Sequence, residues 1–107
     1  MKYKMSRFMA LHIDNGEDAV KFYSEILGFT VKVREGDSVE LESEERTIYV
    51  DNTKDCKGLV LEFNVEDLDA AKKELLDNGC EIIKWEGKGG CCYIRDPFGL
   101  TFNVWQD

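Results

Sequence analysis

The chain has 107 residues, of which 43% are hydrophobic, and its formal net charge is −8 at pH 7. This length suits one ordinary domain with a single core and leaves no room for a second independent domain. Because nucleic-acid binding needs a basic surface, the excess of acidic residues argues against a nucleic-acid partner. The composition favours small molecules or a second copy of the chain as partners.

The apolar stretches are too short to cross a membrane, since a spanning helix needs roughly 20 apolar residues. Residues 1–4 are not followed by the apolar run and cleavage site of a secretory signal. We therefore expect a cytoplasmic protein with no membrane partner, in which thiols stay reduced. The cysteines lack a Cys-x-x-Cys spacing, so we expect four free thiols, at Cys56, Cys80, Cys91 and Cys92.

The first half of the chain, about residues 1–54, predicts a strand, a helix and three more strands. Residues 8–13 are apolar and strand-like, and residues 14–17 supply a turn and a helix cap. A helix should follow, with apolar residues at three-to-four spacing as far as Ile26 and Leu27, and should end at Gly28. The three later strands are expected at residues 30–34, 39–42 and 47–50.

The second half, about residues 55–107, repeats this order. A strand at residues 59–65 leads to the acidic cap Glu66-Asp67 and to a helix that ends at Asn78-Gly79. Further strands are expected at residues 81–85, 91–95 and 101–106. The sequence therefore predicts a single α+β domain over residues 1–107, built from two βαβββ modules.

Strand alternation divides the side chains between two faces of each module. Leu59, Leu61, Phe63 and Val65 should pack under the helices. The opposite face should bound a cavity or an interface, and it is expected to be aromatic with a few polar groups.

Several short motifs add a family resemblance. Ile13-Asp14, Ala19, Phe22-Tyr23 and Leu27-Gly28-Phe29 lie in the first half, and Asp96-Pro97-Phe98-Gly99 precedes the last strand. Their order and spacing resemble the vicinal oxygen chelate superfamily, which includes glyoxalases, bleomycin resistance proteins and dioxygenases, over nearly the whole chain. The resemblance implies paired βαβββ modules, usually in a homodimer. It leaves open whether the modules pair within one chain or between two.

The resemblance also indicates where metalloenzymes of this superfamily carry His and Glu ligands. The corresponding positions here are Phe8, Tyr49, Val60 and Asn103. Phe and Val cannot coordinate a divalent ion, and neutral Tyr and Asn are poor anchors. We therefore expect no metal at these positions and no other cofactor.

Two side chains are candidates for acid-base chemistry. His12 is the single histidine and titrates near neutral pH, and its position resembles one that often contacts substrate in the family. Glu62 could act with it if the carboxyl group lies in an apolar cavity, because burial raises a carboxyl pKa. The alternatives are a hydrogen-bonded His12 without chemistry and a Glu62 exposed on the surface.

The leading prediction is a metal-independent, dimeric protein that binds a small and partly aromatic molecule. By resemblance, sequestration of a bleomycin-like antibiotic is one version of this role, and the acidic charge suits a cationic drug. The expected ligand contacts are Phe8, His12, Tyr49, Glu62, Tyr93, Asn103 and Trp105.

Three alternatives remain open at this level. The chain could be a glyoxalase-type lyase or isomerase that uses His12 and Glu62. It could be a metalloenzyme with a non-standard site formed by His12, Glu62 and Asp51. It could also fill its own pocket with side chains and serve only as an interaction module.

Overall fold

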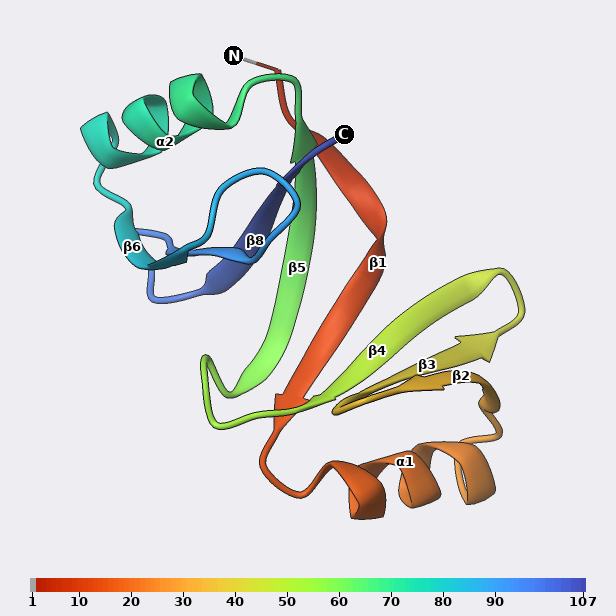
Figure 1. Cartoon of the computed structure of the whole chain (residues 1–107). Coiled ribbons are helices and arrows are strands. Elements are labelled where there is room, and N and C mark those ends of the chain that lie inside the picture. Colours follow the sequence, from red (N-terminus) through yellow and green to blue (C-terminus); the bar gives the residue numbers. More distant parts are fainter. Residues whose placement is uncertain (1) are drawn as a thin grey trace. The chain divides into compact units, whose positions relative to one another are not determined.

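The computed structural model describes residues 2–107, which form eight strands and two helices (Figure 1). The chain divides into two compact units. The first unit is residues 7–59, and the second unit is residues 60–107 together with residues 2–6. Strand β1 (Lys4–Ile13) contributes to both, because residues 4–6 belong to the second unit.

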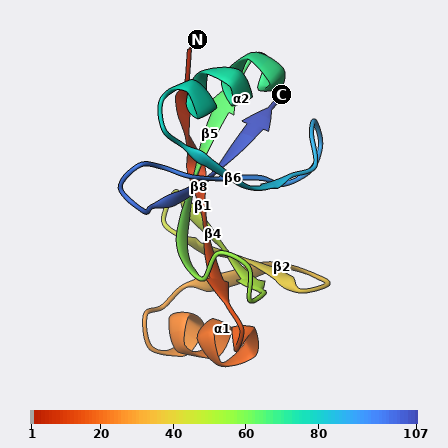
Figure 2. The ribbon, with the colours of Figure 1, turned by 90° about the vertical axis from the view of Figure 1, so that its left-hand side faces the viewer.

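In the first unit, a helix lies on one face of four strands. After β1 come α1 (Gly16–Glu25), β2 (Thr30–Glu35), β3 (Ser38–Ser43) and β4 (Arg46–Asn52). The strand order is β2-β3-β4-β1, with β1 parallel to β4 and the other neighbours antiparallel. Figure 2 shows α1 on one side of these strands.

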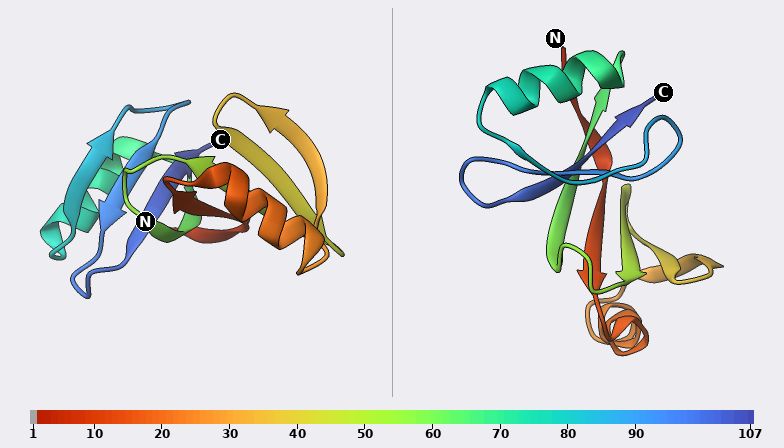
Figure 3. Two further views of the ribbon diagram at one scale, coloured as in Figure 1. Left: turned by 90° about the horizontal axis from the view of Figure 1, so that it is seen from below. Right: turned by 60° about the vertical axis from the view of Figure 1, so that its left-hand side comes forward.

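The second unit repeats this topology. Its elements are β5 (Gly58–Val65), α2 (Leu68–Asp77), β6 (Glu81–Trp85), β7 (Cys92–Arg95) and β8 (Thr101–Gln106). The order is β5-β8-β7-β6, with β5 parallel to β8, and α2 lies on one face (Figure 3). Even the register irregularity recurs, between Val31 and Val33 in β2 and between Ile82 and Lys84 in β6. The predicted α+β fold of two βαβββ modules is confirmed.

Each unit has its own hydrophobic core between helix and sheet. In the first unit, Val20 of α1 packs with Leu41 of β3 and Val50 of β4. In the second unit, Leu68 and Ala71 of α2 pack with Ile94 of β7 and Val104 of β8. Met9 and Leu11 pack against the first of these cores, so the side chains that alternate with them in β1 face away from α1.

Both helices begin at the same kind of contact. The backbone N–H of Gly16 donates to Asn52 Oδ1 at 3.1 Å, and the N–H of Leu68 donates to Gln106 Oε1 at 2.8 Å. Asn52 and Gln106 are the last residues of β4 and β8, the corresponding strands of the two units. A side chain from the end of the sheet therefore satisfies the first amide of each helix, which has no partner within the helix.

Three details differ from the sequence prediction. Strand β1 starts at Lys4 rather than at residue 8. Helix α1 ends at Glu25, and the predicted apolar residues Ile26 and Leu27 lie beyond it, 70% and 51% exposed. Leu59, which was expected to pack under a helix, is 55% exposed because it precedes the part of β5 that α2 covers.

Candidate functional site

The candidate site in the first unit is the sheet face opposite α1. The parallel register pairs Phe8 with Thr47, Ala10 with Tyr49 and His12 with Asp51. The rings of Phe8 and Tyr49 approach to 5.7 Å between centroids with an interplanar angle of 58°. Strand alternation therefore places two aromatic rings on this face of the sheet.

Acidic side chains of β3 continue the same face. Glu40 pairs with Tyr49 and Glu42 pairs with Thr47, whereas the alternating Val39 and Leu41 are buried in the core. The guanidinium of the exposed Arg7 lies 5.1 Å from the centroid of the Phe8 ring. This aromatic surface therefore already accepts one cation, as the negative face of an aromatic ring allows.

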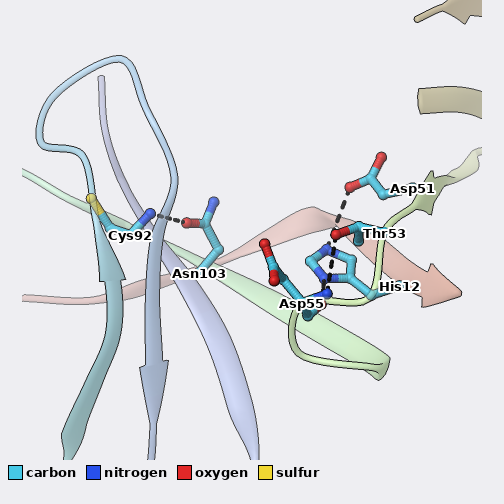
Figure 4. A network of polar contacts seen from close by, with 6 residues as sticks. All are labelled: His12, Asp51, Thr53, Asp55, Cys92 and Asn103. Carbon is cyan, nitrogen blue, oxygen red and sulfur yellow. Dashed lines mark hydrogen bonds and ion pairs between the residues drawn. The ribbon is translucent and has the colours of Figure 1, made fainter. Parts of the chain in front are cut away.

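His12 is held between two acceptors at the end of β1 (Figure 4). Its side chain is 1% exposed. Nδ1 lies 2.8 Å from the carbonyl oxygen of Asp55, and Nε2 lies 3.4 Å from Asp51 Oδ2. Because a carbonyl oxygen only accepts, Nδ1 must carry a proton, and a second proton on Nε2 makes the ring a cation that forms an ion pair with Asp51.

These contacts favour the imidazolium form of His12. Burial by itself lowers the pKa of His12, but the Asp51 and Asp55 contacts outweigh burial and raise the pKa above its ordinary value. Burial also opposes ionisation of Asp51, yet hydrogen bonds from His12 and Ser38 and the His12 charge lower the pKa of Asp51. The result is an ion pair between a buried imidazolium and a partly exposed carboxylate, and the loss of Asp51 would leave the buried charge without its partner.

A short turn presents the Asp55 carbonyl to His12. The backbone N–H of Asp55 donates to Thr53 Oγ1 at 3.1 Å, and the N–H of Thr53 donates to the carbonyl oxygen of Ile13 at 3.0 Å. Cys56 follows with a positive φ of 53°, which is uncommon for a residue other than glycine. The sequence analysis missed this turn as part of the His12 environment, because no local motif marks a backbone carbonyl as a partner.

In the second unit, three predicted contact residues form one row across the sheet. The register pairs Glu62 of β5 with Asn103 of β8, and Asn103 with Tyr93 of β7. Trp105 lies two residues further along β8, opposite Asn64. The adjacent Ile94 and Val104 belong to the core under α2, so this row lies on the face away from the helix.

The polar members of this row have distinct environments. Asn103 Oδ1 accepts a hydrogen bond from the backbone N–H of Cys92 at 2.8 Å (Figure 4). Glu62 is half-buried, and burial, assisted by the negative charge of Asp107, raises its carboxyl pKa. Such a carboxyl group is a better proton acceptor than an ordinary glutamate.

The four positions at which related metalloenzymes carry ligands do not fit a metal ion. Phe8 and Tyr49 are engaged with each other, Val60 is a buried aliphatic residue, and the amide oxygen of Asn103 accepts from Cys92. Of the non-standard trio, His12 and Asp51 meet within the first unit, whereas Glu62 belongs to the second. Residues 2–107 contain no group of three or more His, Cys, Asp or Glu side chains suited to a metal.

The structure also contains a cavity that the sequence analysis did not identify. It lies in the second unit, on the face that α2 partly covers, and has a volume of about 370 Å³. Leu61, Phe63 and Phe102 contribute to its walls. Alternation predicted where these side chains point but could not show that α2 leaves them incompletely covered.

Comparison with known proteins agrees with the paired modules and defines the class of protein. The family model described as the Glyoxalase/Bleomycin resistance protein/Dioxygenase superfamily matches residues 7–104. The chain belongs to this family, and the resemblance found from its motifs is confirmed. No curated protein matches it.

Solved structures show the same fold at low sequence identity. A superfamily member from Vibrio splendidus 12B01 has a TM-score of 0.67 at 17% identity, covering 99% of each chain. The methylmalonyl-CoA epimerase of Streptomyces coelicolor has a TM-score of 0.59 at 17% identity, covering 98% of this chain and 99% of that one.

A larger relative contains the fold as one part. The Mn(II)-bound glyoxalase from Novosphingobium aromaticivorans has a TM-score of 0.63 at 16% identity, and the match covers 97% of this chain but 38% of the glyoxalase. At these identities the likeness concerns the fold alone. Among the described residues, neither helix has the length and apolar composition needed to cross a membrane.

Proposed function

We propose that the protein binds a small, planar organic cation without the help of a metal ion. The observation that carries this proposal is the Phe8–Tyr49 ring pair on the sheet face opposite α1. It stands where related metalloenzymes would hold two metal ligands. Aromatic rings offer a large contact area with few rotatable bonds, so they bind planar molecules at low entropic cost.

The charge of the ligand follows from the neighbouring side chains. Glu40 and Glu42 flank the aromatic pair in register, and Arg7 shows that the Phe8 ring accepts a cation. The net charge of −8 adds a long-range attraction for cations. Sequestration of a cationic antibiotic is the biological role that this chemistry suits best.

Within this proposal, the contact residues divide between the two units. Phe8 and Tyr49 supply stacking in the first unit, and His12 holds Asp51 in position through the ion pair. In the second unit, Glu62, Tyr93, Asn103 and Trp105 supply ligand contacts on the face away from α2. We further propose that the protein is a homodimer, as its family resemblance implies, and that it acts in the cytoplasm.

Calorimetric titration with a planar aromatic cation such as proflavine, in EDTA, tests the proposal. We expect binding without added metal and weaker binding of a planar anion such as anthracene-9-carboxylate. Tyr49→Ala should weaken binding about tenfold, because it removes about 1.4 kcal/mol of stacking and apolar contact. Phe98→Ala is the matched control, since Phe98 is an aromatic residue that is 85% exposed outside this face.

Two results would contradict the proposal. One is binding that disappears in EDTA and returns with a divalent ion. The other is an equal loss in Tyr49→Ala and Phe98→Ala, which would show that no particular aromatic surface is used. Sedimentation of the same samples reports whether the protein is a dimer.

A second candidate function is proton transfer at a carbon next to a carbonyl group. The raised pKa of the half-buried Glu62 favours it. His12 is less suited as the base, because both ring nitrogens face acceptors that hold the imidazolium form. Methylmalonyl-CoA epimerase, which shares the fold, is named for an epimerisation.

Deuterium exchange into an acyl thioester, followed by NMR, tests this candidate. We expect Glu62→Gln to abolish exchange, with a loss of at least about a hundredfold, the usual contribution of a positioned general base. Glu66→Gln is the control, because Glu66 is an exposed acid of the same unit. Exchange that persists in Glu62→Gln would rule out Glu62 as the base.

A further inference from the structure

The second unit contains an apolar cavity on the opposite sheet face from Glu62 and Asn103. Its walls include Leu61, Phe63 and Phe102, which alternate with those two residues along β5 and β8. Helix α2 covers the neighbouring Val65 and Val104 but leaves the cavity-lining side chains only partly buried. We propose that this cavity binds a second class of ligand, an elongated apolar molecule that carries one ammonium group.

The apolar walls fit the hydrocarbon part of such a ligand. Phe63 and Phe102 meet edge to face with ring centroids 5.3 Å apart, which gives the cavity an aromatic floor. Leu75 of α2 forms one wall, and the 67% exposed Leu100 lies at another. The volume of about 370 Å³ lies at the lower end of the range for small-molecule pockets, so it suits a ligand of modest size.

The polar groups of the cavity indicate a positive charge on the ligand. Asp96 and Thr101 line it, and the hydroxyl of Tyr3 donates to Glu74 Oε1 at 2.9 Å. The described residues that line the cavity include no lysine or arginine. An ammonium group that enters beside Asp96 would therefore meet a carboxylate without a competing cation from the cavity wall.

The position of Asp96 is fixed before any ligand arrives. Its Oδ1 accepts hydrogen bonds from the backbone N–H groups of Phe98 at 2.8 Å and Leu100 at 2.9 Å, which close the Asp96–Gly99 turn. A preorganised carboxylate costs less to bind than a mobile one, because its side-chain entropy is already lost. The turn thus has a role beyond chain reversal, since it places one charge at the edge of an apolar cavity.

NMR titration of the ¹⁵N-labelled full chain tests the inference with three probes of equal length. These are 4-phenylbutylammonium, the neutral 4-phenylbutanol and the anionic 4-phenylbutyrate. We expect the ammonium probe to bind most tightly and to shift the amide signals of Leu61, Phe63, Leu75 and Thr101. The amide signals of Phe8 and Tyr49 should not move, which separates this cavity from the aromatic surface of the first unit.

Two variants and one control identify the cavity groups. Asp96→Asn should weaken ammonium binding about tenfold, because it removes the charge but keeps an oxygen for the turn. Leu61→Phe should weaken all three probes by filling the space. Glu66→Gln removes the same charge from an exposed site of the same unit and should leave binding unchanged.

Three outcomes would overturn the inference. The three probes could bind equally, which would remove the role of Asp96. Their shifts could map to Phe8 and Tyr49, which would assign them to the other surface. Sedimentation could also show that self-association excludes the ammonium probe from the cavity, which would make a second copy of the chain its occupant.

Discussion

At the residue scale, His12 and Asp51 show how a charged pair is maintained inside a small protein. The 1% exposed imidazole would be costly to charge alone, but the Asp55 carbonyl accepts from Nδ1 and the Asp51 carboxylate lies 3.4 Å from Nε2 as an ion-pair partner. Sequence reasoning identified His12 as a titrating group. It could not identify the Asp55 carbonyl, because that oxygen belongs to a turn 43 residues away.

The His12–Asp51 pair predicts a pH window of greatest stability. The pKa of His12 is raised above 6.5 in the folded chain, so its stabilisation is complete below pH 6.5 and is lost as the pH rises through the folded pKa. The pKa of Asp51 is lowered below 3.8, so its stabilisation is present above pH 3.8 and is lost as the pH falls through its folded pKa. The pair should therefore stabilise the protein most between these two ordinary values.

Asp51→Asn tests this window. At pH 6 we expect the free energy of unfolding to fall by about 1.5–3 kcal/mol, the typical value of a hydrogen bond to a charged group. The NMR pKa of His12, the single histidine, should fall as well. Asp37→Asn, an exposed acid in the same unit, is the control. An unchanged His12 pKa in Asp51→Asn would contradict the ion pair.

At the element scale, the two helices begin with the same type of hydrogen bond, which the local sequence does not reveal. Each helix receives its first hydrogen-bond acceptor from the last residue of a strand, Asn52 for α1 and Gln106 for α2. At the start of α1 the contact is close, since a Cβ added to Gly16 would lie 2.9 Å from Asn52 Cβ. Packing against Asn52 therefore requires glycine at position 16.

Removing either acceptor should destabilise the fold by a similar amount. Asn52→Ala and Gln106→Ala each leave one helix amide without its partner, and we expect each to cost about 1 kcal/mol in chemical denaturation. Asp67→Ala provides a reference value for the loss of a helix cap, because Asp67 Oδ1 accepts a hydrogen bond from the N–H of Ala70 at 3.1 Å. A negligible effect in both strand-end variants would show that water replaces these acceptors.

At the scale of the whole molecule, the residues of β1 are divided between the two units. Residues 4–6 belong to the second unit and the rest of the strand belongs to the first. Tyr3, just before β1, donates to Glu74 of α2, and this contact, after burial, raises the pKa of Tyr3 to about 12. The second unit therefore combines two separate segments of the chain, whereas the first unit is continuous.

We expect a single cooperative unfolding transition, as for one domain. Urea curves followed by far-UV circular dichroism and by tryptophan fluorescence should coincide, because a strand shared by both units cannot unfold in one of them alone. Tyr3→Phe should shift both curves equally. Two separated transitions would show that the units are independent domains and would contradict the predicted single domain.

Local signals along the chain were enough to predict the elements, their repeated order and the faces of the strands. Hydrophobic periodicity and turn residues are local signals, and they predicted β6 and β8 with the observed bounds. The sequence also showed that Phe8 and Val60 cannot be metal ligands, since that depends on residue type alone.

The contacts that join distant residues could be identified only in the folded chain. The Asp55 carbonyl at His12, the Asn52 and Gln106 acceptors and the cavity beside Asp96 all depend on three-dimensional placement. The exposure of Leu59 also depends on three-dimensional placement, because the position of the helix, rather than the apolar pattern of the strand, determines which strand residues are covered. Local sequence patterns thus determine the strands and helices. The packing of distant segments determines which side chains come together to form a site.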